Sequence, residues 1–570
     1  MRNLIRLLLL LFVIHVTMVP VFGDYSEAFP IASGVVPHHL LAKEIMVDFF
    51  SFITKEKQLP YTIILLSPDH FHSASLDRGN SFISVNWESN DVKLGDLTIG
   101  SELLKELAVK IRIRQDQSAV LSEFGITNLL PLIKKYLPEV KIVPILIPAN
   151  ISREKVCKLV NIINQISSAQ TIMVASVDFS HYLPPDAASF HDVKSIRVLL
   201  NDEEEHFENI EVDSWQSLYA VRLFARLRKK ENPVLIAHKS FMDFLSFSPD
   251  ETTSYFSVVF KEGETKDSID GETILLAGDM MLGRGIAELN KKNGIYYPFQ
   301  KIGRLLRGVD VVFANLEGPV GENPLEFGSD KLRFAFLPPV LTGVTWSKIN
   351  LLSLVNNHVT DMGAEGLQET RDWLDKYQIS YIDNILYSYQ DKPNSYFSTE
   401  HSVFLAFNRV LPFVHREEEI VKEIRAAKID NPSKFVIVSI HWGEEYQLKS
   451  SPAQRELAQR MITAGADIIV GHHPHVVQEI ELIQGKPVFY SLGNFIFDQQ
   501  NIPETQEGLM VGLAVEPDRA TFYLFPIQHH LGQPMLMSQS AAKKFLMGVA
   551  EKSDKKLEED VKKGIIETKR

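Results

Sequence analysis

The feature that most constrains the fold is a short apolar run that recurs along the chain and stops each time at polar residues. In the second half of the chain these runs span 273–277, 310–314, 350–355, 435–440 and 466–470. Runs of this length, without alternation of polar and apolar residues, are typical of strands buried on both faces. Helical patterns lie between them, as at 363–377. Strands that alternate with helices predict an α/β fold with a mostly parallel sheet.

The first half shows the same pattern and is separated from the second half by a polar segment. Its apolar runs span 61–66, 141–148 and 171–177, with helical patterns at 103–113 and 215–229. Residues 261–271 contain two glycines and no large apolar residue except Ile269, which is the composition of a linker. In a chain of 570 residues this division predicts two domains, 30–260 and 272–535.

The two ends of the chain have a different character from the body. Residues 1–23 begin with Arg2 and Arg6 and continue with an apolar run, which is the pattern of an export signal rather than of a core helix. We therefore expect an exported protein of the cell envelope, with membrane association through this segment if it is retained as an anchor; cleavage and retention both stay open. Residues 541–570 are rich in charge and carry apolar residues at helical spacings, so they predict a charged helical tail.

Composition excludes several functional classes. The chain has 59 basic against 72 acidic residues, a net charge of −13, and no basic stripe, which argues against nucleic acid as a partner. Cys157 is the only cysteine, which excludes an intrachain disulfide and a zinc site built from cysteines. Any metal site must therefore use nitrogen and oxygen ligands.

Polar residues that follow the apolar runs of the second half form a candidate metal site. The carboxyl ends of strands in α/β sheets are where loops converge and ligands bind. Carboxylates, an amide oxygen and imidazoles suit Zn, Mn or Fe, and the set is large enough for one or two ions. Two adjacent ions are a common means of hydrolysing phosphate esters. The predicted ligands are Asp279, Glu317, Asn357, His441, His472 and His475.

Three further residues of the second half have predicted roles. His358, which lies beside Asn357 and is followed by Asp361, is a candidate general acid for a leaving group. Arg284, shortly after Asp279, is a candidate anion-binding residue. Simpler interpretations stay open, because a single histidine such as His441 is often only hydrogen bonded, and Arg284 is equally compatible with a surface charge.

Six ordered motifs of the second half resemble the CapA family of poly-γ-glutamate capsule biosynthesis proteins, which is related to calcineurin-like metallophosphoesterases. The resemblance covers about 272–528 and implies a four-layer α/β/β/α sandwich, with the six predicted ligands at the family's metal positions. Met281 stands where ordinary phosphoesterases carry the histidine of an Asp-x-His motif. The motifs are GDMMLGR (278–284), NLEGP (315–319), NNHVTDMG (356–363), HWGEEY (441–446), GHHPHVVQ (471–478) and SLGNFIFD (491–498).

Histidines and an aspartate follow the strands predicted in the first half. His38, His70 and His181 could form a mononuclear metal site, with Asp178 orienting an imidazole; equally, these residues could cap loops and bind nothing. The arrangement resembles the Memo family, including protein B of the AmmeMemoRadiSam system, over about 31–260. That resemblance implies an α/β fold similar to the extradiol-dioxygenase catalytic subunit, with a His-rich pocket. The cysteine that the family carries before the helix near 215–227 is absent, and Asp213 stands there.

These observations favour one function and leave two alternatives open. The leading hypothesis is an exported, metal-binding CapA-type protein that takes part in making or exporting a cell-envelope polymer, with metal-dependent hydrolysis as the candidate activity of its second domain. Its expected partner is an anionic polymer or a phosphate- or γ-glutamyl-type substrate. The first alternative is a non-catalytic envelope binding or scaffold protein. The second is a metal-dependent oxidoreductase that acts through the first domain.

Overall fold

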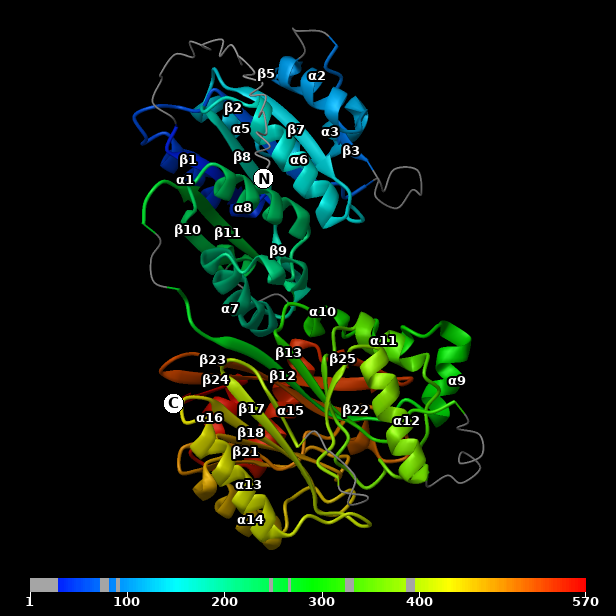
Figure 1. The fold of residues 1–570 in the computed structure, drawn as a ribbon. Coiled ribbons are helices and arrows are strands. Elements are labelled where there is room, and N and C mark those ends of the chain that lie inside the picture. Colours follow the sequence, from blue (N-terminus) through cyan, green and yellow to red (C-terminus); the bar gives the residue numbers. More distant parts are fainter. Residues whose placement is uncertain are drawn as a thin grey trace, which may run out of the picture.

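The computed structural model describes residues 29–71, 81–88, 93–245, 250–264, 268–322, 333–385 and 395–570. The predicted export segment at 1–23 lies outside these residues. Within the described part of the chain, every helix is too short or too polar to cross a lipid bilayer. Figure 1 shows two α/β units, with the first half of the chain in blue to green and the second half in green to red.

The first unit is built on one 11-stranded sheet with helices on its faces. At its centre β1, β8, β2 and β7 lie side by side and parallel, and β11 pairs antiparallel with β1. Its helices are α1 (Lys43–Ile53), α2 (Ser101–Lys110), α3 (Gln117–Ser122), α4 (Phe124–Thr127), α5 (Leu130–Tyr136), α6 (Arg153–Ile166), α7 (Pro185–Asn201) and α8 (Trp215–Leu227). Its strands are β1 (Ile31–Val36), β2 (Thr62–Pro68), β3 (Phe82–Ser84), β4 (Lys93–Leu94), β5 (Leu97–Ile99), β6 (Ile113–Gln115), β7 (Lys141–Ile147), β8 (Thr171–Ser176), β9 (Phe179–Leu183), β10 (Asn232–Ser240) and β11 (Thr252–Lys261).

The second unit contains two sheets. The nine-stranded sheet comprises β12 (Glu272–Met280), β13 (Val311–Leu316), β14 (Leu351–Ser353), β15 (Ser380–Ile382), β22 (Asn494–Ile496), β23 (Glu507–Val515), β24 (Arg519–His530), β25 (Gln533–Leu536) and β26 (Ile565–Lys569). The six-stranded sheet comprises β16 (Tyr396–Ser398), β17 (Ser402–Asn408), β18 (Phe435–His441), β19 (Ile468–His472), β20 (Ile480–Ile483) and β21 (Lys486–Phe489). The helices are α9 (Arg284–Asn293), α10 (Gly303–Leu306), α11 (Val340–Trp346), α12 (Gly363–Lys376), α13 (Glu417–Asp430), α14 (Pro452–Ala464), α15 (Gln539–Lys552) and α16 (Glu558–Lys563).

Alternating side chains show that the two sheets pack face to face. On β17, Phe404 belongs to the core shared with the nine-stranded sheet and stacks on Phe313 of β13, with ring centroids 6.2 Å apart. The neighbouring Leu405 and Phe407 point to the other face and join the core formed with α13 and α14. Successive side chains of a strand point to opposite faces, so the six-stranded sheet is covered on both sides. The predicted α/β class is confirmed.

A helix of the first unit covers part of the second unit. On β24, Phe522 faces the six-stranded sheet, and the next residue, Tyr523, faces Phe190 of α7 with ring centroids 5.4 Å apart. An ion pair also links the two units at this interface. Arg197 of α7 donates two hydrogen bonds of 2.9 Å to the carboxylate of Asp310. The two units therefore share a core and a buried ion pair rather than only a linker.

The C-terminal tail differs from its prediction. Helical spacing predicted a helix through 541–570, but α16 ends at Lys563. Gly564, which follows, has a positive φ of 78°, and β26 comes next. β26 pairs antiparallel with β24 and buries Ile566. The β-branched pair Ile565–Ile566 favours a strand, and the free edge of β24 supplies its partner. The tail is thus two helices and one strand of the nine-stranded sheet.

Candidate functional site

The second-domain site is centred on Asp279, which lies near the end of β12 and is fully buried. Its Oδ1 lies 3.2 Å from Nδ1 of His472, and its Oδ2 lies 3.4 Å from Nδ1 of His475. Nε2 of His475 lies 4.0 Å from Oε2 of Glu317, the residue that follows β13. Asp279, Glu317 and His475 therefore bring one ligand atom each within 4.8 Å of one another.

The other two predicted ligands lie in the same network. Nδ1 of His441 lies 3.9 Å from Oε1 of Glu317, and its Nε2 lies 2.8 Å from Oδ1 of Asn357. Strand register explains the convergence on the six-stranded sheet, because His441 on β18 is opposite His472 on the parallel strand β19. The structure thus brings all six residues predicted from the second half to one place.

Asn315 is a central member of this network that the sequence prediction missed. Its Nδ2 donates to Oδ1 of Asp279 at 2.8 Å and approaches Oε1 of Glu317 at 3.4 Å. Its Oδ1 accepts a hydrogen bond of 3.1 Å from Nδ2 of Asn356. The signal was present in the sequence, because Asn315 is the first polar residue after the apolar run at 310–314 and opens the NLEGP motif.

Three buried polar atoms of the site lack a hydrogen-bond partner. They are Oε2 of Glu317 and both ring nitrogens of His472. The contact between His472 and Asp279 is short enough for an ion pair but is not aligned as a hydrogen bond. Buried polar groups are normally satisfied because leaving them unpaired costs free energy. Unpaired carboxylate and imidazole atoms around one point form a donor set that fits Mn, Zn or Fe.

Burial and close charges shift the pKa values of these groups in opposite directions. Burial and the nearby Asp279 carboxylate both raise the pKa of Glu317 well above its usual range. Burial opposes ionisation of Asp279, but contacts with His472 and His475 hold its pKa well below its usual range. Burial also disfavours the charged form of His475, yet Glu317 and Asp279 raise its pKa to about 9. The protonation state of each of these groups therefore depends on the charges of the others.

The loop after β19 has a strained backbone that turns it over Asp279. His473 and His475 have positive φ angles of 96° and 58°, a conformation that residues with a Cβ rarely adopt. The strained backbone lets the amide of His473 donate to Oδ2 of Asp279 at 3.1 Å. His473 and His475 also form a second group of close ligand atoms with Glu445. Strain of this kind is concentrated at functional sites.

His358 and Asp361 lie together, as predicted, while Arg284 has a partner that the sequence did not reveal. Nδ1 of His358 lies 2.9 Å from Oδ2 of Asp361, and the ring of Phe334 stacks on the imidazole at 4.0 Å. The Arg284 guanidinium pairs with the Asp498 carboxylate, with 3.1 Å between Nε and Oδ2. Arg284 thus already holds a carboxylate of the chain, from the last residue of the SLGNFIFD motif.

The first-domain site lies at the carboxyl ends of three adjacent parallel strands. His38 follows β1, Asp178 follows β8 and His70 follows β2, in the order in which the strands lie in the sheet. This is where ligands bind in open α/β sheets. His38, Asp178 and Asp213 are buried or nearly so, whereas the side chain of His70 is 23% exposed.

The group of close ligand atoms in this site is His38, His70 and Asp213. Nε2 of His38 lies 3.5 Å from Oδ2 of Asp213, and Nε2 of His70 lies 3.8 Å from the same oxygen. Asp213, which was not among the predicted residues, belongs to this group, whereas His181 lines the same pocket outside the group. A signal for Asp213 was present in the sequence, because this residue stands where the family resemblance leads one to expect a cysteine.

The opposite ring nitrogens of both histidines are held by other side chains. Nδ1 of His70 lies 2.7 Å from Oε1 of Glu123, and Nδ1 of His38 lies 3.3 Å from Oγ of Ser176. The ring of Phe124 stacks on His70 with centroids 4.3 Å apart. These contacts orient both imidazoles so that Nε2 faces Asp213, which is how proteins hold histidine ligands of a metal.

Asp178 and His181 lie beside this group. Oδ1 of Asp178 accepts a hydrogen bond of 3.1 Å from the backbone amide of His38, and its Oδ2 lies 3.3 Å from Nε2 of the same histidine. His181 lines the same pocket between two residues with positive φ, Ser180 and Tyr182. Burial lowers the pKa of His181. Burial also disfavours the charged form of His70, but the nearby carboxylates of Asp213 and Glu123 raise its pKa to about 10.

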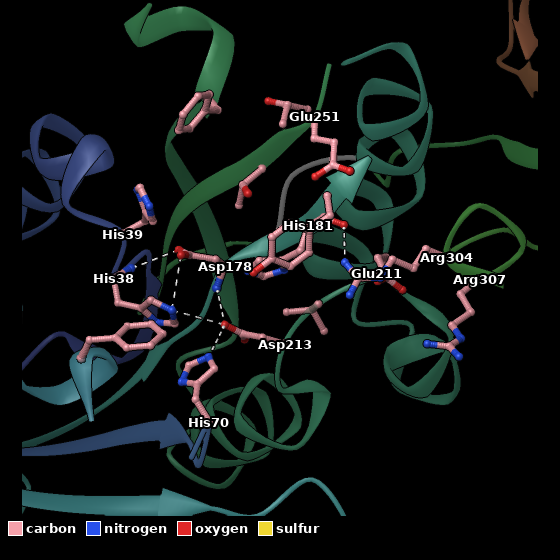
Figure 2. Close-up of a pocket in the computed structure, with 16 residues that line it drawn as sticks. His38, His39, His70, Asp178, His181, Glu211, Asp213, Glu251, Arg304 and Arg307 are labelled. Carbon is pink, nitrogen blue, oxygen red and sulfur yellow. Dashed lines mark hydrogen bonds and ion pairs between the residues drawn. The ribbon is translucent and has the colours of Figure 1, made fainter. Parts of the chain in front are cut away.

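The first-domain site opens into a cavity of about 520 Å³ with walls from both domains. Figure 2 shows His38, His70, Asp178 and Asp213 on one side of this pocket and Arg304 and Arg307 on the other. The two arginines come from α10 and the residue after it, in the second domain. Glu211 and Glu251 also line the pocket.

The sequence matches two protein families, one in each half. Residues 273–385 and 383–499 match the family of bacterial capsule synthesis proteins (PGA_cap), and residues 25–219 match the family of Memo-like proteins. Both resemblances drawn from the motifs are thereby confirmed.

Curated relatives divide in the same way. The capsule biosynthesis protein CapA of Bacillus anthracis is 33% identical over 249 residues, which are 40% of this chain and 60% of that protein. The chain therefore spans less than two thirds of the length of this relative. The PGA biosynthesis protein CapA of Bacillus subtilis is 29% identical over 282 residues, 47% of this chain and 74% of that protein. A MEMO1 family protein of Caldivirga maquilingensis is 24% identical over 241 residues, 40% of this chain and 83% of that protein.

Proposed function

This chain joins a Memo-like domain to a domain of the bacterial capsule synthesis protein family, and from that premise we propose that its second domain is a divalent-metal site for hydrolysis in capsule polymer biosynthesis. The polymer would be anionic, of the poly-γ-glutamate type, and the scissile group a phosphate ester or a γ-glutamyl bond. Export through residues 1–23 would place the protein at the cell envelope. The names of the two CapA relatives support the link to capsule and poly-γ-glutamate biosynthesis.

One observation carries the metal proposal. Asp279, Glu317 and His475 offer three ligand atoms within 4.8 Å of one another, in a place where Glu317 keeps a buried carboxylate oxygen without a hydrogen bond. Two of these atoms are anionic when ionised, and an ion between them would relieve the repulsion that raises the pKa of Glu317. When bound, such an ion polarises a phosphoryl or carbonyl oxygen and lowers the pKa of water.

Other residues of the chain have roles that need no ion. Asn315 donates to Oδ1 of Asp279 and the His473 amide donates to Oδ2, and these two hydrogen bonds fix the orientation of the carboxylate. Asp361 accepts from Nδ1 of His358, which leaves Nε2 to carry the proton for a leaving group. His441 holds the amide oxygen of Asn357 in the network.

Metal analysis of the full chain tests this proposal. We expect bound Mn, Zn or Fe that is lost from the second domain in an Asp279→Asn, Glu317→Gln double variant. The matched control is Asp213→Asn, which alters the first-domain site and should leave the second-domain ion in place. Metal content unchanged in the double variant would refute the site.

Turnover is tested separately from binding. The purified chain, supplied with Mn, should hydrolyse a generic phosphodiester, a phosphomonoester or a γ-glutamyl peptide, and His358→Ala should slow the reaction while metal content stays the same. Metal binding without turnover of any of these substrates would instead favour the non-catalytic envelope role.

The first domain supports a second candidate function, metal-dependent oxidoreduction. His38, His70 and Asp213 form a set of two histidines and one carboxylate, which is the ligand set of non-haem Fe(II) oxygenases. Asp213 supplies the oxygen ligand where the family carries a cysteine. Iron that remains in the Asp279→Asn, Glu317→Gln variant and is lost in Asp213→Asn would support this function.

A further inference from the structure

We propose that Arg304 and Arg307 of the second domain complete the first-domain pocket as a binding site for a small molecule with a carboxylate or phosphate group. This inference goes beyond the proposed function, because it concerns the other domain and does not depend on metal in either site. The pocket would then be a composite of both domains, with the ligand's oxyanion at the arginines and the rest of the ligand toward His70 and Asp213.

The first argument is that both guanidinium groups line the cavity without an ion-pair partner. Among the described residues, neither Arg304 nor Arg307 has a carboxylate oxygen within 4.0 Å, and Arg304 makes one hydrogen bond, of 3.0 Å, to the carbonyl oxygen of His181. Each side chain carries five N–H donors, so most of their donors remain available. Arginine is well suited to bind carboxylate and phosphate because two parallel N–H groups match two oxygens.

The second argument is that aromatic rings hold both side chains in place. The guanidinium carbon of Arg304 lies 4.6 Å from the ring centroid of Tyr182, and that of Arg307 lies 5.2 Å from the ring centroid of Trp346. Such stacking restrains the planar group and leaves its edge N–H groups free. Tyr182 itself comes from the first domain and lines the same pocket.

The third argument is that the backbone between the arginines is fixed against the first domain. Nε2 of His191, on α7, lies 3.0 Å from the carbonyl oxygen of Leu305. Gly308 has a positive φ of 72°, and a Cβ there would lie 3.3 Å from both the Glu211 amide nitrogen and the His191 ring. With the Arg197–Asp310 ion pair, these contacts keep Arg304 and Arg307 at the pocket wall.

The fourth argument is the arrangement of charge in the pocket. The His38, His70 and Asp213 cluster lies at one side and the guanidinium groups lie at the other, beside the carboxylate of Glu211, as Figure 2 shows. On the side opposite the arginines, Oδ1 of Asp213 is buried and has no hydrogen-bond partner. A polar group of the ligand could therefore contact this oxygen. A cavity of about 520 Å³ has the size of a small-molecule site. The geometry therefore fits a polar ligand with an oxyanion at one end.

Site-resolved labelling of arginine in the full chain tests this inference. Phenylglyoxal reacts with accessible guanidinium groups, and peptide mass spectrometry reports the labelling rate of Arg304 and Arg307 separately. The probes are inorganic phosphate and L-glutamate, each tested alone. At a probe concentration about twice its Kd, we expect labelling of both arginines to slow about threefold. The exposed Arg425 on α13 is the control and should react at one rate throughout.

Variants make the test specific. In Arg307→Gln, protection of Arg304 should require about tenfold more probe, equal to ~1.4 kcal/mol. Arg307→Lys, which keeps the charge, should lose less, and Arg425→Gln should change nothing. Protection by phosphate alone or by glutamate alone assigns the oxyanion. Unchanged labelling of both arginines with either probe would overturn the inference, whatever the outcome of the metal and hydrolysis experiments.

Discussion

The two sites use similar side chains in different surroundings. Both lie at the carboxyl ends of parallel strands and combine histidine with carboxylate. In the second domain, Asp279 and Glu317 are fully buried and the side chain of His475 is 4% exposed. In the first domain, the His70 side chain is 23% exposed and faces a cavity. The comparison teaches that the depth of a site, rather than its residue types, decides whether a ligand can enter directly.

The two sites also differ in what holds them in shape. Hydrogen bonds from Asn315 and from the strained His473 backbone hold the second-domain site within its own domain. The first-domain pocket takes one wall from the second domain through Arg304 and Arg307. Changes at the domain interface should therefore alter the first-domain pocket and leave the second-domain network intact.

The largest expected effect is the loss of Asp279. In metal-free protein, Asp279→Asn removes the charge that faces His472 and His475 and should lower the free energy of unfolding by about 3–5 kcal/mol. Chemical denaturation measures the change. Asp498→Asn is the control, because Asp498 pairs with the partly exposed Arg284 and should cost about 1 kcal/mol. Equal losses in both variants would contradict the contrast between buried and exposed pairs.

The interface ion pair should come next. Asp310→Asn leaves the buried Lys194 without its carboxylate, removes one of the two carboxylates that contact Arg197, and should cost about 3 kcal/mol in denaturation experiments. Labelling of Arg304 should accelerate, while the metal content of the second domain stays constant. Glu203→Gln alters a contact of the same Arg197 inside the first domain and should leave Arg304 labelling unchanged. A loss of second-domain metal in Asp310→Asn would show that the two sites are not independent.

Removal of the predicted general acid should affect turnover alone. If the second domain hydrolyses its substrate, His358→Ala should lower kcat about hundredfold, which corresponds to ~2.7 kcal/mol of activation free energy. Steady-state kinetics measure kcat, and elemental analysis checks that metal remains. The exposed His530, at the end of β24, is the control histidine. An unchanged kcat in His358→Ala would remove this residue from the mechanism.

The smallest expected effect concerns the protonation of His70. Its pKa is raised from 6.5 to about 10, so its contribution to folding stability is complete below about pH 6.5 and is lost as pH rises toward 10. Glu123→Gln removes one of the two carboxylates that raise this pKa and should lower it by about one unit, or ~1.4 kcal/mol. NMR titration of the metal-free protein measures this shift. A pKa that stays near 10 would mean that Asp213 alone sustains it.

Local pattern was sufficient for much of the fold and for most of the second-domain site. The apolar runs that end at Asp279, Glu317 and His441 predicted strands whose ends converge, because parallel strands place their carboxyl ends at one edge. Asn315 was missed although it directly follows such a run. The strand β26 was missed because Ile565 and Ile566 also fit helical spacing, and only the unpaired edge of β24 selects the extended form.

The sequence alone determined the α/β class, the two family matches and the types of side chain that meet at both sites, because these depend on short-range pattern and on motif residues. Tertiary structure decided the rest. It placed Asp213 in the first-domain group and paired Arg284 with Asp498. It also brought Arg304 and Arg307 to a pocket of the other domain. These are contacts between residues far apart in the chain, and they follow from how α7 packs on the second domain, which no local pattern encodes.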